Sequence, residues 1–476
     1  MVTFLICLAL LVAAYFGYGA YLDRVCKIDA KAAVPSATLY DGVDYIPMPR
    51  WRTFLIQLLN IAGIGPIFGA IMGACFGPVV FLWITLGGIF VGAMHDYISG
   101  VILLRNDGLS LPEIVGRYLG KGMLQFMRAI SLVLLILVGV VFMRSPASIL
   151  GDMVSLIPYW GWIAIILVYY FVATMLPIDK LIGKIYPVFG GALIFMAVGL
   201  AVVLFTGDYT IPNLTLDTLR NYQPNAEAVP IIPTLFITVA CGAISGFHAT
   251  QSPLMARCMN NEGEARMIFY GSMITESIIA LIWAAMGMAF FYGPDSLAAA
   301  LAEHGNNAAW AVGTISNTTL GVVGGFIALF GVVAAAVTSG DTAFRSARLI
   351  IADVLGVEQR SIAKRFMIAV PLFAIGIALL FVDFDVVWRY FAWSNQALSV
   401  VTLWVIVVYL KKYKRNIWVA MPPAVFMTYI CTSFVFVSGQ FIGMQNRPLA
   451  YALAGAVTLL ITVGMWIKVQ QRAKME

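Results

Sequence analysis

The chain has 476 residues, of which 61% are hydrophobic and 11% are charged, so water is excluded as its main solvent. Its formal net charge is +6, but the basic residues lie in short connecting segments rather than in one patch, which excludes a nucleic-acid partner. The apolar runs last about twenty residues without the alternation of a barrel strand. These features predict an all-α membrane protein, built as a single integral membrane domain over residues 1–476.

About thirteen apolar runs are long enough to cross a bilayer. They lie near residues 2–22, 53–74, 77–104, 123–143, 159–177, 185–206, 230–250, 266–292, 320–339, 366–387, 390–410, 417–438 and 448–468. The first run lacks a basic lead-in and a convincing cleavage site, so we expect a retained span rather than a signal peptide. The segments 207–229 and 294–319 are polar and read as water-facing connectors.

The basic residues predict the orientation. All but four of the 29 lysines and arginines lie beside connections that follow odd-numbered spans or in the C-terminal tail, the exceptions being Arg144, Arg220, Arg389 and Arg447. Cytoplasmic connections carry the basic excess, so we expect the N-terminus outside and the C-terminus in the cytoplasm of a bacterial inner membrane. The segment 340–365 is the largest basic surface, and we expect it to contact lipid headgroups.

Two spans contain helix-breaking residues. The second reads Asn60-Ile61-Ala62-Gly63-Ile64-Gly65-Pro66, and the seventh reads Ala240-Cys241-Gly242-Ala243-Ile244-Ser245-Gly246-Phe247-His248. Interrupted spans in corresponding positions of two halves indicate an inverted-repeat transporter with its site at mid-membrane. This predicts one repeat over 53–206 and another over 230–410, with an extra helix at 1–22 and two more at 417–468. The alternative is a glycine stripe that serves close helix packing.

At these motifs the sequence resembles the carbon starvation protein A family, the CstA-type transporters. The matching patches are DGVDYIP at 41–47, IAGIGP at 61–66, DGLSL at 107–111, FITVACGAISGFH at 236–248, NEG at 261–263 and NQ at 395–396, with a further stretch at 341–356. The resemblance implies a fold of the leucine-transporter class, with five plus five core helices, and uptake of peptides or pyruvate during carbon starvation. Leu55-Ile56-Gln57 stands where the family often has Gly-His-His, which leaves the solute and the coupling ion open.

We expect the substrate's carboxylate to bind at the break in the second span. Unwinding there exposes the N-terminus of a half-helix, whose free N–H groups and partial positive charge attract an anion. The candidate substrate-binding residues are Asn60, Gly63, Gly65, Cys241, Gly242, Ser245, Gly246, His248 and Gln251. For His248, substrate contact or proton handling stands against a purely structural role.

Polar residues at the end of the ninth span and in the eighth are candidates for ion coupling: Thr338, Ser339, Asp341, Thr342 and Glu276. The resemblance implies that hydroxyls at 338–342 supply a sodium site, whereas the alternative is a helix cap with an Asp341–Arg345 ion pair. Glu276 is either a proton-coupling acid or a lock between helices. We expect His95 and Asp96 to snorkel or to cap a loop.

The sequence argues against an enzyme, because three scattered histidines form no zinc motif and no Gly-x-Ser-x-Gly elbow occurs. The six cysteines have no metal-ligand or redox spacing, so we expect no disulfide, no metal and no cofactor. Protons and Na⁺ both remain candidate coupling ions. A channel or a nutrient sensor is the alternative of a different class.

Overall fold

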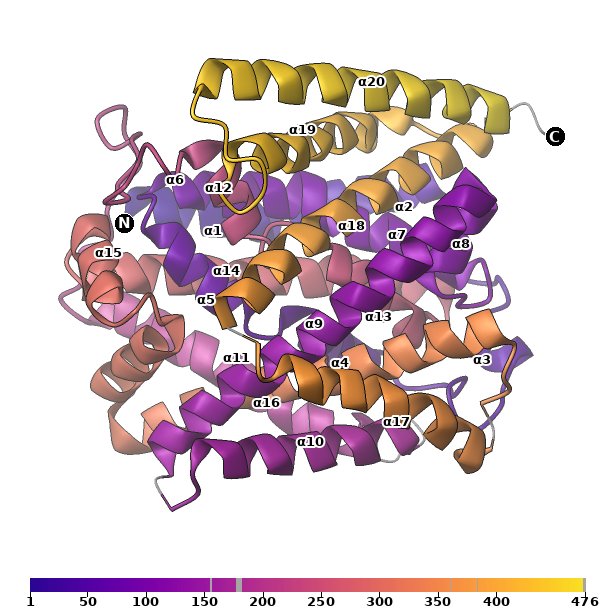
Figure 1. Ribbon diagram of the computed structural model, residues 1–476, viewed down its shortest axis with the longest axis horizontal. Helices are drawn as coiled ribbons and strands as arrows, with labels where there is room; N and C mark the ends of the chain where they lie inside the picture. The colour runs from indigo at the N-terminus through magenta and orange to yellow at the C-terminus, as the bar shows by residue number, and fades with distance from the viewer. Residues whose placement is uncertain (155, 177–181, 360, 383, 474–476) are drawn as a thin grey trace.

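The computed structural model describes residues 1–154, 156–176, 182–359, 361–382 and 384–473, and every regular element within these ranges is helical (Figure 1). The α-helices are α1 Val2–Phe16, α2 Tyr18–Cys26, α3 Pro35–Thr38, α4 Arg50–Ala62, α5 Gly65–Ala74, α6 Val79–Leu82, α7 Met94–Leu104, α8 Leu111–Leu119, α9 Lys121–Met153, α10 Tyr159–Met175, α11 Ile182–Thr206, α12 Ile231–Thr238, α13 Gly246–Ala256, α14 Ser272–Phe290, α15 Pro294–Glu303, α16 Ala308–Leu355, α17 Ile362–Leu379, α18 Phe384–Lys412, α19 Met421–Val437 and α20 Arg447–Ala473. Trp83–Ala93 is π-helical and joins α6 to α7. The predicted all-α architecture is confirmed.

Ten helical stretches of the described chain are long and apolar enough to cross a membrane, and the bent pair α4 and α5 makes up to eleven. Two further predicted spans fall outside that test. The predicted span 159–177, whose last residue lies outside the described chain, corresponds to α10, a shorter apolar helix. The predicted span 230–250 corresponds to α12 and the N-terminal part of α13, which a non-helical segment separates. Each predicted span therefore overlaps one or more observed helices, although α16 extends beyond the predicted span 320–339 at both ends.

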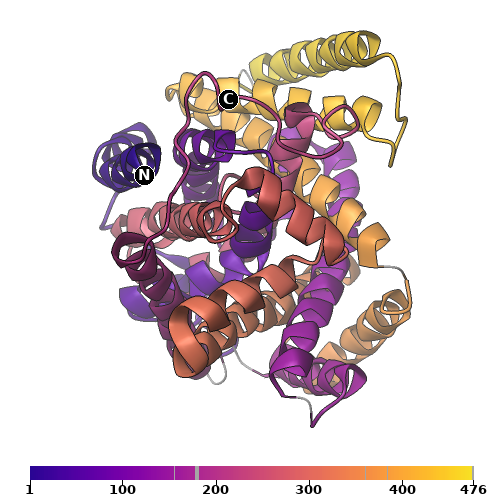
Figure 2. The same ribbon diagram turned by 90° about the vertical axis from the view of Figure 1, so that its left-hand side faces the viewer.

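Burial distinguishes core helices from peripheral ones. In Glu262–Phe290, which ends with α14, 83% of the most apolar stretch is buried inside the protein, against 17% in Arg447–Arg472 of α20. Figure 2 shows the N-terminal helices and α20 on the outside of the bundle. In the interior, α4 and α5 pack against α14 and α16, and α13 packs against α4, α16 and α18. Lipid-facing helices can thus be apolar all round, while polar side chains gather in the core.

Helix α16 corrects two predictions about residues 338–365. It runs from Ala308 to Leu355 with a kink at Gly321, so the predicted end of the ninth span near residue 339 is wrong. Residues 338–342 lie in the middle of a helix and cannot cap its C-terminus.

Three arginines of the basic segment 340–365 are buried, although most of residues 353–364 are exposed. Arg345, Arg348 and Arg365 are 1%, 0% and 4% exposed, so the predicted headgroup contact is wrong for these three side chains. Arg345 bonds to the carbonyls of Ala173 and Leu176, and its Nη1 lies 3.6 Å from Asp44 Oδ1. The sequence showed the charges, but the burial of Arg345 and Arg348 follows from the continuation of α16 into the protein, and Arg365 of α17 donates to the carbonyls of Gln359 and Met175.

Candidate functional site

The first break lies between α4 and α5. Helix α4 ends at Ala62, Gly63 adopts φ 50° and ψ −141°, and α5 begins at Gly65, with a bend of 46° between the two helices. A positive φ of this kind is readily accessible to glycine, and Pro66 supplies no backbone donor to rebuild the lost turn. The predicted break is therefore confirmed, at the residues where the sequence placed it.

The second break is the segment 239–245, between the end of α12 at Thr238 and the start of α13 at Gly246. Gly242 within it has φ 93°. Trp83 Nε1 donates to the freed Val239 carbonyl at 3.0 Å. At the start of α13, Asn395 Oδ1 accepts from Phe247 N at 2.7 Å and from Ser245 Oγ at 3.0 Å. A side chain of α18 thus caps α13 in place of a residue of its own segment.

The two breaks touch one another. A Cβ added to Gly65 would overlap the Cys241 side chain, and one added to Gly69 would lie 2.9 Å from the Thr238 carbonyl oxygen. A Cβ on Gly63 would overlap the ring of Phe142. Packing therefore requires glycine at all three positions, and the backbone conformation requires it at Gly63 as well, so the two explanations offered by the sequence both hold.

Buried amide side chains near the first break have polar atoms without partners among the described residues. Neither side-chain atom of Asn60 makes a hydrogen bond, although the residue is 0% exposed. Gln57 Nε2 donates to Ser252 Oγ at 3.3 Å, but its Oε1 has no partner, and Gln251 Oε1 has none either. An unsatisfied buried polar atom costs about 1–3 kcal/mol, so such atoms indicate a place for a solute or water.

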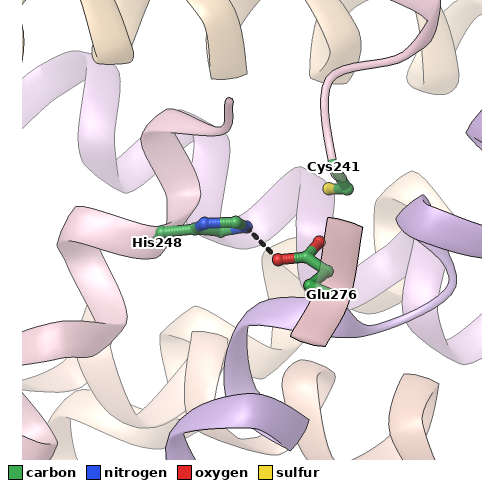
Figure 3. A group of neighbouring side chains, drawn as sticks. All are labelled: Cys241, His248 and Glu276. Carbon is green, nitrogen blue, oxygen red and sulfur yellow. Dashed lines mark ion pairs between the residues drawn. The ribbon is translucent and has the colours of Figure 1, made fainter. Parts of the chain in front are cut away.

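A chain of titratable side chains runs beside the second break. His248 Nδ1 lies 2.7 Å from Asp96 Oδ2, and His95 Nδ1 lies 2.8 Å from Asp96 Oδ1. His248 Nε2 lies 3.4 Å from Glu276 Oε2, and all four side chains are 0% exposed. Figure 3 shows His248 and Glu276 pointing toward one another from α13 and α14.

The snorkelling or loop-capping role expected for His95 and Asp96 is therefore wrong. Adjacent helix positions point about 100° apart, which suggested separate environments. In the structure Asp96 uses one oxygen for each histidine. The signal that could have identified Asp96 is a carboxylate placed well inside the apolar stretch Val79–Leu104.

Cys241 completes a group with His248 and Glu276. Each of the three offers one ligand atom, and these atoms all lie within 4.8 Å of one another, so they could hold a metal ion. Figure 3 shows Cys241 on the connecting segment beside the two other side chains. Sequence spacing gave no hint of this group, because its members come from three separate positions along the chain.

The predicted ion-coupling residues on α16 divide into two environments. Ser339 Oγ donates to the Leu59 carbonyl of α4 at 2.7 Å, close to the first break. Asp341 accepts hydrogen bonds from Tyr169 and Tyr186 at 2.9 Å. The alternative of an Asp341–Arg345 ion pair is not what the described contacts show, because the ion pair of Arg345 is with Asp44.

The hydroxyls beside these residues bond within α16: Thr338 Oγ1 donates to Ala335 O at 2.9 Å and Thr342 Oγ1 to Thr338 O at 3.0 Å. The structure therefore brings Ser339 to the first break. The coupling role of this group, and that of Glu276, stays a prediction.

A cavity approaches the first break from the end of the molecule that carries residues 304–309. It measures about 430 Å³ and reaches Phe68 of α5, one turn beyond Gly65, with Arg144 and Trp388 on its walls. At the opposite end, the cavity between Ser110 and Arg257 measures about 10 Å³, the space of one water molecule. The larger cavity thus leads toward the first break from one end, whereas the cavity between Ser110 and Arg257 has room for one water molecule.

Comparison with known proteins extends these observations. The family model described as "Carbon starvation protein CstA" matches residues 1–151 and 147–322. A membrane protein of Haemophilus influenzae is 43% identical over 346 residues, which cover 62% of this chain and 93% of that protein. The peptide transporter CstA of Campylobacter jejuni is 28% identical, over 56% of this chain and 47% of that protein. The pyruvate/proton symporter BtsT of Escherichia coli is also 28% identical, over 56% and 46%.

Among solved structures, a mutant of the manganese transporter of Eremococcus coleocola is similar in fold. It has a TM-score of 0.52 and 11% sequence identity, and the match covers 92% of this chain and 99% of that one. The fold is of the leucine-transporter class that the sequence predicted. The family model covers most of the chain, including both breaks, so the chain belongs to the carbon starvation protein CstA family.

Proposed function

We propose that this transporter is a secondary active uptake system for small nutrients that carry a carboxylate, with peptides as the substrate class. It acts in the bacterial inner membrane during carbon starvation, with its N-terminus outside and its C-terminus in the cytoplasm. The names of its relatives support this proposal, because several are peptide transporters. Pyruvate is the second candidate, favoured by the similarity to a pyruvate/proton symporter.

The observation that carries the proposal is the contact between two broken helices around buried polar atoms. Unwound backbone at mid-membrane is tolerated where it lines a binding site. Helix α5 begins at Gly65 and has no side-chain cap, so the N–H groups of Ile64 and Gly65 and the dipole of α5 favour an anion. The substrate's carboxylate binds there, near Asn60 and Gly63, and the segment from Cys241 to Ser245 completes the pocket.

The arrangement of cavities supports alternating access. The cavity of about 430 Å³ that ends at Phe68 leads toward the site from the proposed outer face. At the other end, Arg105 Nε donates to Glu262 Oε1 at 2.9 Å, and Arg257 Nε donates to the Gly108 carbonyl at 2.8 Å. These contacts tie together segments that must separate before a solute can leave into the cytoplasm.

Uptake into proteoliposomes tests this function. Purified protein is reconstituted, and accumulation of short peptides, amino acids and pyruvate is measured under imposed proton and sodium gradients. We expect one carboxylate-bearing class to accumulate above its external concentration, and we expect dissipation of the gradient to abolish accumulation. A channel would only equilibrate the solute, and a sensor would take up none, so either outcome contradicts the proposal.

We expect Asp341→Asn and Thr338→Val to lower gradient-driven accumulation about 10-fold, corresponding to ~1.4 kcal/mol, with a smaller effect on solute binding. Both substitutions remove oxygen ligands or charge near Ser339, which already contacts the freed end of α4. Accumulation and equilibrium binding are measured on the same preparation. Thr319→Val is the matched control, since Thr319 Oγ1 makes a similar bond within α16, to Ile315 O at 2.7 Å. Equal losses of binding and accumulation would contradict a coupling role.

A further inference from the structure

Three buried side chains converge beside the second break. Cys241 lies in the non-helical segment 239–245, His248 in the first turn of α13 and Glu276 in α14. Their exposed fractions are 5%, 0% and 0%. One ligand atom from each lies within 4.8 Å of the other two (Figure 3). A thiol, an imidazole and a carboxylate are the ligand types that proteins use for zinc and related ions.

The ring nitrogen Nε2 of His248 and the carboxylate oxygens of Glu276 lack hydrogen-bond partners among the described residues. His248 Nε2 has none, and neither has Glu276 Oε1 or Oε2. The separation of 3.4 Å between His248 Nε2 and Glu276 Oε2 is longer than the usual hydrogen bond between nitrogen and oxygen. Leaving polar atoms unpaired at this depth costs free energy, and an ion between the two side chains would satisfy His248 Nε2 and the Glu276 carboxylate at once.

The other nitrogen of His248 fixes the orientation of its ring. Nδ1 lies 2.7 Å from Asp96 Oδ2, so in the neutral imidazole it donates its proton to the carboxylate. The lone pair of Nε2 then faces the Glu276 oxygens, and two acceptors that face each other repel unless a proton or a metal ion lies between them. A histidine held by a carboxylate on the side away from the ion is a common arrangement in metal sites.

We propose that Cys241, His248 and Glu276 bind one divalent transition-metal ion, of which Zn²⁺ best accepts a sulfur, nitrogen and oxygen donor set. The thiolate and the Glu276 carboxylate together balance the two positive charges, which is required where water is excluded. Three protein ligands leave the fourth tetrahedral position open. The ion links the segment 239–245 to α13 and α14, so it stabilises the second break. This site goes beyond the proposed nutrient uptake and does not depend on it.

Metal binding to the purified protein tests the proposal. The protein is prepared in detergent, freed of any affinity tag, treated with a chelator and then titrated with Zn²⁺ or Co²⁺. We expect one ion per chain by elemental mass spectrometry and a higher melting temperature with Zn²⁺. We also expect a thiolate-to-metal charge-transfer band with Co²⁺, because Cys241 supplies the sulfur ligand.

Variants identify the ligands. Cys241→Ser should lose the charge-transfer band, and Glu276→Gln should keep the band but bind Zn²⁺ at least 10-fold more weakly. Cys7→Ser is the matched control, since Cys7 is a buried cysteine of the peripheral helix α1, and it should behave as the unsubstituted protein. Size-exclusion chromatography establishes that each variant is folded.

Wild-type protein that binds neither ion in stoichiometric amount overturns the proposal. The same holds if Co²⁺ binds without a thiolate band, or if the band persists in Cys241→Ser. The wild-type spectrum alone decides whether sulfur ligates the ion, even if a variant fails to fold. No solute is present in these measurements, so failure to bind metal leaves the proposed uptake function unaffected, and failure of uptake leaves the metal site unaffected.

Discussion

Asn60→Asp is expected to weaken binding of the carboxylate-bearing solute by about 100-fold, and Asn60→Ala by about 10-fold. Aspartate matches asparagine in shape, so it fits the same buried position, but its charge faces the substrate's carboxylate, and like-charge contacts cost about 3 kcal/mol. Alanine removes only hydrogen-bonding atoms, which have no partner within the described protein. Equilibrium binding of the transported solute to monodisperse protein provides the measurement.

The order of these two effects separates binding from packing. If Asn60 served packing alone, the isosteric aspartate would be tolerated better than alanine, which leaves a cavity. Binding in Asn60→Asp that equals or exceeds binding in Asn60→Ala would therefore place the carboxylate elsewhere.

Gly65→Ala is expected to destabilise the protein by about 2 kcal/mol, and a second substitution, Cys241→Gly, is expected to recover most of that loss. A Cβ at residue 65 would overlap both Cβ and Sγ of Cys241, so removing the cysteine side chain makes room for it. The melting temperatures of the chelator-treated wild-type protein, both single variants and the double variant form a cycle whose coupling term reports the contact between the two breaks. Metal-free protein is used so that loss of the proposed Cys241 ligand does not enter the comparison.

Gly191→Ala is the matched control for this cycle. Gly191 lies in α11, and a Cβ added there meets nothing within 4 Å. Alanine in place of a helical glycine is expected to raise stability slightly, by roughly 0.5–1 kcal/mol. Additive effects of Gly65→Ala and Cys241→Gly would show that the breaks do not touch.

The buried arginines show where sequence reasoning went wrong. The arginines at 345, 348 and 365 are predicted to contact lipid headgroups, because cytoplasmic segments are rich in basic residues and loops usually face water. Arg345 is buried because α16 continues into the protein and the carbonyls of Ala173 and Leu176 accept its hydrogen bonds. Arg365 of α17 donates to the carbonyl of Met175, and the sequence could not bring these groups together.

The sequence by itself determined the helical spans and both breaks. Lipid imposes a minimum apolar length on every span, and the effects of glycine and proline on the helix at Gly63-Ile64-Gly65-Pro66 are local, so both signals can be read along the chain. Only the tertiary structure decided the partners of the buried polar groups. Asp96 meets His248 across 152 positions, and Tyr186 meets Asp341 across 155. Such pairs are selected by how the helices pack and by the free-energy cost of leaving polar atoms unpaired in a dry interior. The spacing of residues along the sequence reveals neither the packing nor this cost.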